Sequence, residues 1–375
     1  MDGILRGIRR TLALGACSLS ILALAVTPAL AAATTVNVTA GGGSTDQAVQ
    51  ADLFFPGTIT IDAGDSITWA DGSGEAHTIT FGSAPPGPPD LAPAGGTSVD
   101  GSSLVSSGLL LPIPGKGYTL NFPKVGTFNY QCLIHPASMK GSVVVQAAGS
   151  AYPTSQATYK AASDPLLTAA ITAGEAALAA QTVTSKANGD GSTTYYENTG
   201  LGDGKSYTIE RFGAQNLNVH VGDTVVWTQK DPNEAHTVTF LNNGQDIPAT
   251  LPNGQPNPQE QPPAGGKVYG GSGLFSSGFL FPQATYALTF SKVGTYQYVC
   301  LLHDTLGMKA TVTVLAASTT APAQVPSGGS APTAQIPGQM PNTGGGGSSS
   351  LPWLGLMLCG LLGLGTGVRH LTKQR

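Results

Sequence analysis

An internal repeat constrains the fold of this 375-residue chain more than any other feature. Residues 62–69 recur as residues 220–227, and residues 124–135 recur as residues 292–303, with closely similar side chains. Two further matching strings lie between them, in the same order in both copies, and the offset varies from 158 to 170 residues. A repeat of this length indicates a duplicated domain, because the units of solenoid proteins are much shorter.

Each copy has the sequence pattern of an all-β domain. Short runs such as residues 58–61, 66–69 and 118–122 alternate or are β-branched, and Gly, Pro and Asp separate them. Charged residues make up only 10% of the chain, which argues against long charged helices. We therefore predict an all-β fold of two Greek-key β-sandwich domains, over residues 33–147 and 205–316.

The segment between the copies, residues 148–204, is predicted to be a linker with a short helix. Ser163 and Asp164 suit a helix N-cap, Pro165 suits the first helical position, and an Ala-rich run follows. We expect this helix over about residues 165–181. The Gly-, Thr- and Tyr-rich residues 189–200 indicate a hairpin that joins the second sandwich.

The first 32 residues have the pattern of a cleaved signal peptide. Three arginines precede an apolar run over residues 12–26, and small residues follow Pro28. Such a signal would place the rest of the chain outside the cytoplasm.

The C-terminal part has the pattern of a membrane anchor. Residues 317–350 are rich in Pro, Gly and Ser and predict a flexible stalk. Residues 351–368 form an uncharged run of 18 residues, which as a helix would span about 27 Å, enough to cross a membrane. The basic residues 369–375 should stay in the cytoplasm. The sequence therefore predicts a single-pass C-terminal anchor.

Sortase attachment to the cell wall is the alternative. Residues 340–344, Met-Pro-Asn-Thr-Gly, resemble the Leu-Pro-x-Thr-Gly signal of sortase substrates, with Met340 in place of Leu. We favour the plain anchor. Both interpretations put residues 32–350 on the extracytoplasmic face of the cell membrane.

The charge of the exported part is acidic. Without residues 1–31 and 351–375 the chain keeps 11 basic and 20 acidic residues, a net charge of −9. This balance argues against nucleic acid, whose backbone requires Lys and Arg. It favours a protein partner with a basic surface patch.

The four cysteines narrow the chemistry. Cys17 leaves with the signal peptide and Cys359 lies in the apolar C-terminal run, so each copy keeps one cysteine, Cys132 or Cys300. A disulfide between these two would require equivalent buried strands of separate domains to meet. A small buried hydrophobic residue is the ordinary alternative for a lone cysteine.

The neighbours of the two cysteines favour a metal site. Each cysteine ends a β run and opens a loop with the order Cys-x2-His, then Met after three or four more residues. A loop can fold three donors onto one point, whereas a straight strand sends alternate residues to opposite faces. An earlier Glu-Ala-His-Thr string adds a second histidine in each copy. Two imidazoles, a thiolate and a weak thioether are the ligands of a type 1 (blue) copper centre. The predicted ligands are His77, Cys132, His135 and Met139 in the first copy, and His236, Cys300, His303 and Met308 in the second.

With these landmarks in order, the chain resembles the plastocyanin, pseudoazurin and halocyanin group of cupredoxins, roughly over residues 33–147 and 205–316. The resemblance implies a copper-binding electron carrier, with His135 and His303 near the surface as electron exits. The spacing to Met308 is plastocyanin-like, whereas the spacing to Met139 is one residue shorter and closer to that of azurins.

The residues beside the first histidine of each site are open to more than one interpretation. Thr78 and Thr237 are candidates to hydrogen-bond the Cys-His loop, or are ordinary strand residues. Glu75 and Glu234 are expected to be solvated loop charges.

The supply of histidines argues against an enzyme. Multicopper oxidases require His-x-His pairs, and this chain has none; copper nitrite reductases place a His before the ligand Cys, where this chain has Gln131 and Val299. Beyond the four histidines predicted to be ligands, only His220 and His370 remain.

The function predicted from the sequence is electron transfer by a surface-tethered protein whose two copper centres cycle between Cu(II) and Cu(I). The expected partners are redox proteins and, through the anchor, the membrane, with no nucleic acid and no small-molecule substrate. The alternative is a copper-sequestering surface protein without a redox partner; a subunit of a larger oxidoreductase is a third possibility.

Overall fold

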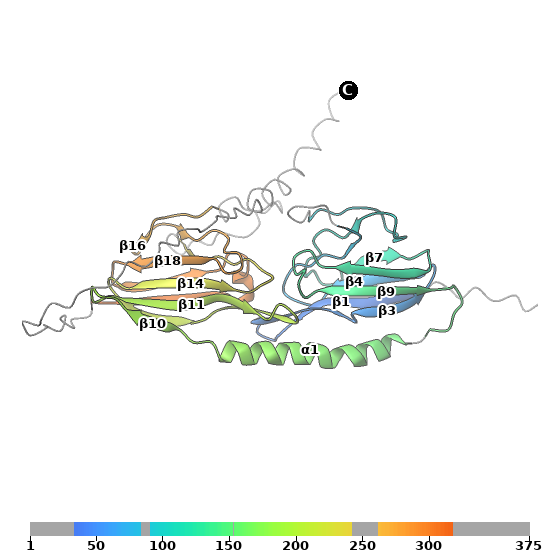
Figure 1. The fold of residues 1–375 in the computed structure, drawn as a ribbon, viewed down its shortest axis with the longest axis horizontal. Coiled ribbons are helices and arrows are strands. Elements are labelled where there is room, and N and C mark those ends of the chain that lie inside the picture. The colour runs from blue at the N-terminus through green and yellow to red at the C-terminus, as the bar shows by residue number, and fades with distance from the viewer. Residues whose placement is uncertain (1–33, 84–90, 153, 242–261, 318–375) are drawn as a thin grey trace, which may run out of the picture.

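The computed structural model describes residues 34–83, 91–152, 154–241 and 262–317, and it is mainly β with one long helix between two β regions (Figure 1). The predicted signal peptide, stalk, membrane anchor and basic tail lie outside the described residues. Within the described ranges, no helix has both the length and the hydropathy required to cross a membrane.

The first β region is a sandwich of two sheets. One sheet has the strand order β2-β1-β4-β7 and the other has the order β3-β9-β8-β5-β6. Its strands are β1 (Thr35–Gly43), β2 (Val49–Phe55), β3 (Thr58–Asp62), β4 (Ser66–Asp71), β5 (Thr80–Phe81), β6 (Val105–Ser106), β7 (Tyr118–Asn121), β8 (Gly126–Gln131) and β9 (Lys140–Gln146).

The second β region repeats this arrangement, with sheets β12-β11-β14-β18-β16 and β13-β20-β19-β15-β17, and with β10 paired to β11. Its strands are β10 (Thr184–Ala187), β11 (Thr193–Gly202), β12 (Tyr207–Phe212), β13 (Asn216–His220), β14 (Thr224–Lys230), β15 (Thr239–Phe240), β16 (Val268–Tyr269), β17 (Phe275–Ser276), β18 (Thr285–Phe290), β19 (Gly294–Val299) and β20 (Lys309–Leu315).

The predicted hairpin before the second sandwich is confirmed, since β10 and β11 pair antiparallel. Its assignment to the linker is wrong. β11 pairs in parallel with β14, as β1 does with β4, so it is the first repeated strand of the second sandwich. The sandwich therefore begins before residue 205, because the repeated strings that defined the domain start only at β13 and left its first strands unmarked.

Each sandwich has its own aromatic core. Trp69 and Trp227 are fully buried at equivalent positions, and each meets a tyrosine edge-on with ring centroids 5.4 Å apart. Edge-to-face packing is the geometry that aromatic pairs favour, and these rings fill the space between the two sheets.

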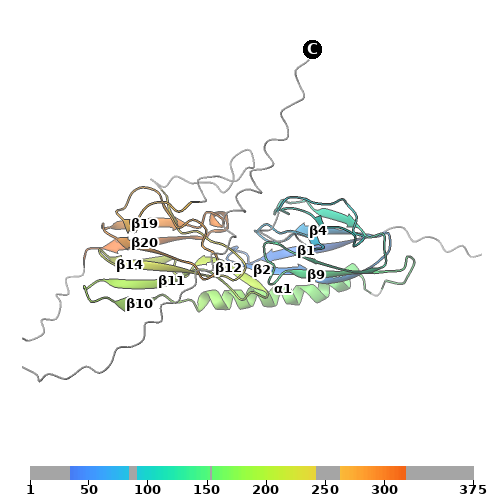
Figure 2. The ribbon, with the colours of Figure 1, turned by 45° about the horizontal axis from the view of Figure 1, so that its top comes forward.

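The two sandwiches share one sheet. β2 pairs antiparallel with β12, with Val49 opposite Ile209 and Ala51 opposite Tyr207, and this pairing continues the first sheet into the second. The result is a 10-stranded sheet among the described residues, and Figure 2 shows β2 and β12 side by side at its middle. We call this pairing the seam. It fixes how the two domains face each other.

The helix α1 (Gln156–Ala179) packs along the seam. Leu167 and Ala170 contact a cluster with Ala51 and Phe55 of β2, and Ile171 also contacts a cluster that spans both domains. The helix runs beneath both sandwiches (Figure 1). Burial against both domains stabilises this helix and makes it part of the structure rather than a loose connection.

The predicted start of this helix is wrong. It begins nine residues earlier, at Gln156, with Ser155 as the N-cap that accepts a hydrogen bond from the Thr158 N–H. Pro165, expected at the first helical position, lies inside the helix. Proline inside a helix lacks a donor and disfavours it, but Ser155 and packing against the seam outweigh that local cost.

The buried Glu197 distinguishes the second core from the first and predicts a pH effect on stability. Its carboxylate accepts hydrogen bonds from the Tyr298 hydroxyl at 2.5 Å and the Ala214 N–H at 3.2 Å. Burial raises the pKa of Glu197 from 4.5 to about 7, although these bonds oppose the shift. The folded protein therefore keeps a proton that the unfolded chain releases, and stability falls as pH rises between these values.

We expect Glu197→Gln to remove this dependence, worth about 2–3 kcal/mol between pH 4.5 and 7. The measurement is urea unfolding of the full chain at both pH values. The informative quantity is the difference between wild type and variant, because other buried acids titrate in both. An equal loss of stability in the two proteins would contradict the prediction.

Candidate metal centres

The loops that carry the cysteines are closed by backbone hydrogen bonds. The Cys132 N–H donates to the Met139 carbonyl at 3.0 Å, and the Met139 N–H donates to the His135 carbonyl at 2.9 Å. The second loop closes in the same way around Cys300, and its additional residue is accommodated by the 3-10 turn η3 (Asp304–Leu306). Both loops therefore hold their Cys, His and Met in a fixed arrangement at the ends of two paired strands. The one-residue difference in the spacing to Met does not change these backbone hydrogen bonds.

In the first domain these closures bring His77, Cys132 and His135 together. The Nδ1 atoms of the two histidines are 3.1 Å apart, and Cys132 Sγ is 3.6 Å from His135 Nδ1. One donor atom from each of the three residues lies within 4.8 Å of the others, and all three side chains are buried.

The second domain repeats this geometry. The Nδ1 atoms of His236 and His303 are 3.1 Å apart, and Cys300 Sγ is 3.8 Å and 3.7 Å from them. Met308 is fully buried in the same cluster as Cys300, as Met139 is with Cys132. Both cysteines are free thiols.

The residues in each set fit copper. A soft thiolate and two imidazoles that converge through the same ring nitrogen suit both Cu(I) and Cu(II), and a buried methionine completes the set. Burial disfavours the Cys300 thiolate, but His303 and His236 outweigh it and lower the thiol pKa from 9.0 to about 6. A thiol that deprotonates readily is ready to bind a metal. Each domain therefore carries one type 1 copper site.

Of the two interpretations of the threonines, the structure supports the hydrogen bond to the Cys-His loop. Thr78 Oγ1 accepts from the Leu133 N–H and Thr237 Oγ1 accepts from the Leu301 N–H, both at 2.8 Å. The backbone N–H groups of the same threonines donate to Cys132 Sγ and Cys300 Sγ at 3.3 Å. Each threonine thus ties the strand of the first histidine to the cysteine loop.

Two glycines beside the sites were not predicted from the sequence. Gly41 and Gly200 lie at backbone irregularities in β1 and β11, with φ angles of +69° and +71°. A Cβ atom on Gly41 would lie 2.4 Å from His77 Nε2, and one on Gly200 would lie 2.2 Å from His236 Nε2. Only glycine leaves room for these rings. The two glycines occupy equivalent positions in the two copies, each after a run of β-forming residues. This repetition is the signal in the sequence that could have identified them.

The expected surface position of His135 is wrong. His135 is fully buried, and its Nε2 contacts Glu234 of the second domain. The resemblance to single-domain proteins led to the wrong prediction, because the seam brings the other domain over this histidine. His303 remains partly accessible, with 12% of its side chain exposed.

His303 lines an apolar groove where the two domains meet. The groove has a volume of about 440 Å³, and its walls include Leu111 and Pro112 of the first domain and Phe279 and Phe281 of the second. One predicted copper ligand therefore reaches a surface that both domains form.

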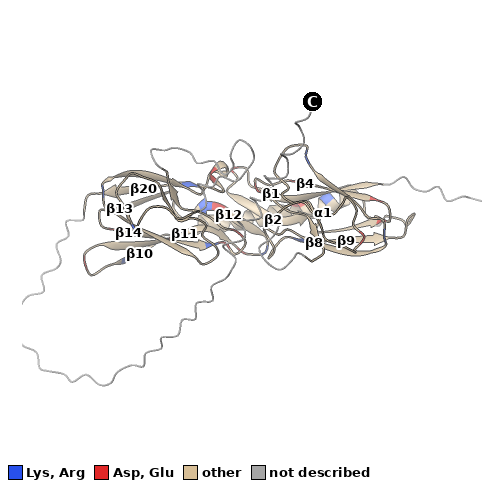
Figure 3. Ribbon diagram, turned by 90° about the horizontal axis from the view of Figure 1, so that it is seen from above, with Lys and Arg blue, Asp and Glu red and all other residues tan. Residues whose placement is uncertain are grey.

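Glu75 and Glu234 are not solvated loop charges, as the sequence suggested. Both are only 6% exposed, and they lie at the domain junction with Asp52 and Glu210, which are fully buried. Figure 3 shows acidic residues beside β12 at the middle of the molecule. The sequence could not reveal this cluster, because its members become neighbours only through the seam.

These junction carboxyl groups differ in charge. Burial raises the pKa of Asp52 to about 7 and raises that of Glu75 well above its ordinary range, so Glu75 favours the protonated form and Asp52 ionises only near neutral pH. Burial also opposes ionisation of Glu234, but His135 and then His303 outweigh it and lower the pKa of Glu234. Glu234 is therefore the most readily ionised of these three.

The two sites also differ in one acidic neighbour. Glu210 Oε2 is 2.6 Å from His303 Nδ1 and 3.7 Å from His236 Nδ1, so it faces the nitrogens that converge in the second site. Asp52 of β2 is grouped with Glu75 and His135 but forms no ion pair with either histidine of the first site among the described contacts.

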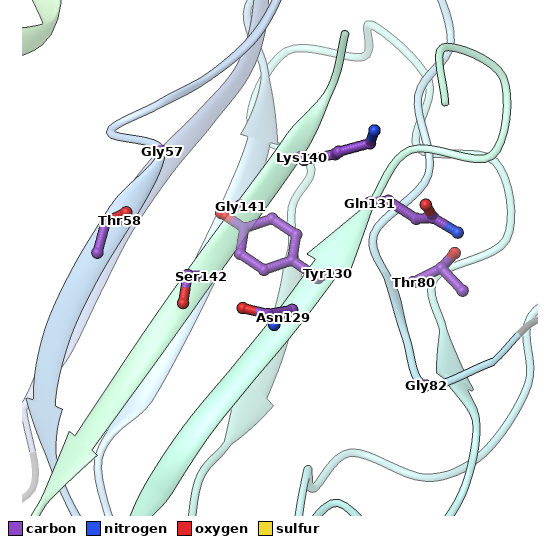
Figure 4. A pocket seen from close by; sticks show the side chains of 10 residues that line it. All are labelled: Gly57, Thr58, Thr80, Gly82, Asn129, Tyr130, Gln131, Lys140, Gly141 and Ser142. Atoms are coloured by element: carbon purple, nitrogen blue, oxygen red, sulfur yellow. The ribbon is translucent and has the colours of Figure 1, made fainter. Parts of the chain in front are cut away.

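A further hollow on the first domain carries none of this chemistry. It has a volume of about 570 Å³ and is lined by ten residues of β3, β8, β9 and their neighbours, among them Tyr130 and Lys140 (Figure 4). None of the ten is a predicted ligand.

Comparison with known proteins agrees with the two sites. The family model of copper binding proteins, plastocyanin/azurin family, matches residues 43–146 and 203–315. Plastocyanin of Tetradesmus obliquus is 40% identical over 95 residues, which are 25% of this chain and 59% of that protein, so the chain spans about three-fifths of this relative. Plastocyanin of Rumex obtusifolius is 36% identical over 95 residues, 25% of this chain and 87% of that protein.

Among solved structures, a Cu(I) form of an amicyanin variant covers 36% of this chain and 98% of its own, at 20% identity and a TM-score of 0.21. The assignment rests on the family model, which matches both repeats, and on the two donor sets. This chain belongs to the plastocyanin/azurin family of copper-binding proteins, with two cupredoxin domains.

Proposed function

We propose that this protein is an electron carrier whose two copper sites exchange single electrons with redox partner proteins, without a substrate and without enzymatic activity. The observation that carries the proposal is the pair of buried His-Cys-His sets, each with a buried methionine. Bound copper would supply the Cu(II)/Cu(I) couple.

The residues around each set keep its geometry constant. Thr78 and Thr237 bind the cysteine loops, and Ser73 Oγ lies 2.8 Å from His77 Nε2. Rigid ligands reorganise little when the metal changes charge, and such pre-organisation favours fast electron exchange. The groove at His303 provides the place where a partner with an apolar surface would exchange electrons. A basic rim on that partner would suit the acidic exported part of the chain.

The location belongs to the same proposal. The N-terminal signal pattern, the apolar residues 351–368 and the basic tail support an exported protein held on the outer face of the cell membrane by one C-terminal span. Attachment to the cell wall at residues 340–344 is the variant of this arrangement. The mass of the mature C-terminus separates them, since sorting ends the chain at Thr343 and an anchor keeps Arg375.

The test is the optical spectrum of the Cu(II)-loaded protein. We expect an intense thiolate-to-copper band at about 600 nm that bleaches when a small one-electron mediator reduces the protein. Absence of the band would reject type 1 electron transfer. A band that forms but does not exchange electrons with the mediator would favour copper sequestration instead.

A further inference from the structure

Glu234 contacts the copper-site histidines of both domains. One carboxylate oxygen, Oε1, contacts His135 Nε2 of the first domain, and the other, Oε2, lies 3.5 Å from His303 Nε2 of the second. In both histidines Nδ1 points to the metal set, so Nε2 is the nitrogen that carries the proton; His135 Nε2 is hydrogen-bonded to Glu234, whereas His303 Nε2 faces the other oxygen of Glu234 at ion-pair distance. A single carboxylate thus connects the outer nitrogens of two ligands.

The surroundings keep this contact dry and fixed. Glu234 is only 6% exposed and His135 is fully buried. The neighbouring Asn233 donates to Asp52 at 3.1 Å and to Ser138 at 3.2 Å, which ties the Glu234 loop to the first domain. Arg211 donates to the Asp46 carbonyl at 2.7 Å and to the Leu306 carbonyl at 2.8 Å, which ties the first domain to the loop of His303.

The accessibility of the two sites differs. His135 has no exposed surface, whereas 12% of the His303 side chain is exposed and lines the groove between the domains. A protein-sized electron donor can therefore approach the second site through its histidine edge. It cannot approach the first site in the same way, because the second domain covers that edge.

We propose that the two sites form an internal relay, in which the first domain exchanges electrons with the outside through the second domain, across the path His135–Glu234–His303. This inference rests on the proposed function. In each transfer one electron passes from Cu(I) in one domain to Cu(II) in the other. The donor becomes Cu(II), the acceptor becomes Cu(I), no covalent bond changes and the Nε2 protons stay in place. Glu234 is a positioning residue in this relay, because it acts through the histidines.

The first test compares single-site proteins with a basic ferrous haem protein as the one-electron reductant, which is too large to enter the junction. Cys300→Ser leaves only the first site and Cys132→Ser leaves only the second. We expect the remaining blue band of the Cys300→Ser protein to bleach at least about tenfold more slowly than that of the Cys132→Ser protein, because no copper in the second domain can pass electrons to the first. Equal rates in the two proteins would overturn the relay.

The second test concerns the bridge itself. In the wild type we expect both sites to bleach in one phase, because electrons redistribute faster than they arrive. In Glu234→Gln the side chain is neutral and has a single acceptor oxygen, so it cannot face both histidines with a carboxylate oxygen, and half of the band should bleach in a slow phase at the rate of the Cys300→Ser protein. A single phase in this variant would remove Glu234 from the path.

Glu75→Gln is the matched control. Glu75 holds the equivalent place in the first copy and is buried to the same extent, and its carboxylate is 3.7 Å from His135 Nε2 but forms no ion pair with His303 among the described contacts. It should keep single-phase bleaching, and a slow phase here would show that replacing any buried carboxyl group at the junction has the same effect. If Glu234→Gln does not fold, the two cysteine variants still decide the relay. A wild type without a blue band would instead reject the proposed function.

Discussion

Replacing Cys300 by serine should abolish the blue band of the second site and leave that of the first. Serine is similar in size to cysteine, but its hydroxyl does not provide the soft thiolate whose charge transfer to copper produces the band at about 600 nm. We expect roughly half of the visible absorption to remain, and the double variant with Cys132→Ser to show none. Spectra of the Cu(II)-loaded variants at equal protein concentration, with metal content measured, test this.

The matched outcome distinguishes two equal sites from a single one. If the spectrum of the Cys132→Ser protein is the same as that of the wild type, the first domain holds no type 1 copper. That result would point to the shorter spacing between His135 and Met139 as a functional difference. Equal losses from both variants would show that the spacing does not matter for the thiolate band.

Gly200→Ala should reduce copper binding in the second site while the fold persists. The added Cβ would lie 2.2 Å from His236 Nε2, so the ring must move away from the other ligands. Displacing groups that orient metal ligands costs about 10–100-fold in metal affinity, and we expect at least this for a displaced ligand. Competition with a Cu(I) chelator measures the affinity, and circular dichroism checks the fold.

Gly222→Ala separates the clash from backbone strain. Gly222 has a φ of +97°, also in the left-handed region, but no atom lies within 4 Å of a Cβ placed there. Both variants should lose about 1–2 kcal/mol of stability from the left-handed backbone, but only Gly200→Ala should lose copper. Gly41→Ala and Gly64→Ala form the same pair in the first domain. Loss of copper from both members of a pair would assign the effect to strain alone.

The sites could be predicted from the sequence because their signals are local. The Cys, His and Met of each site lie within nine residues of one another, and the remaining histidine is marked by a repeated Glu-Ala-His-Thr string. The threonine after that histidine was also within reach, since it follows a ligand and can bond the neighbouring loop. Duplication made each pattern stronger, because chance rarely places the same residue types in the same order twice.

The features that the sequence did not reveal depend on contacts between distant segments. The seam joins Val49 to Ile209, and neither strand carries a pattern that names its partner. The burial of His135 and the role of Glu234 follow from that pairing. The start of the helix was missed for a related reason: Pro165 is a sound local signal, but packing of the helix against two domains overrides it.

The shared sheet has a consequence for any attempt to divide the chain. β2 and β12 are each the outermost strand of their own domain's sheet, so each domain alone would expose a row of unsatisfied backbone N–H and C=O groups. Such a strand is a template for adding further chains, and here the partner copy occupies it. Each copy therefore covers the edge strand of the other, and this protects both from aggregation along the edge that brings the two metal sites together.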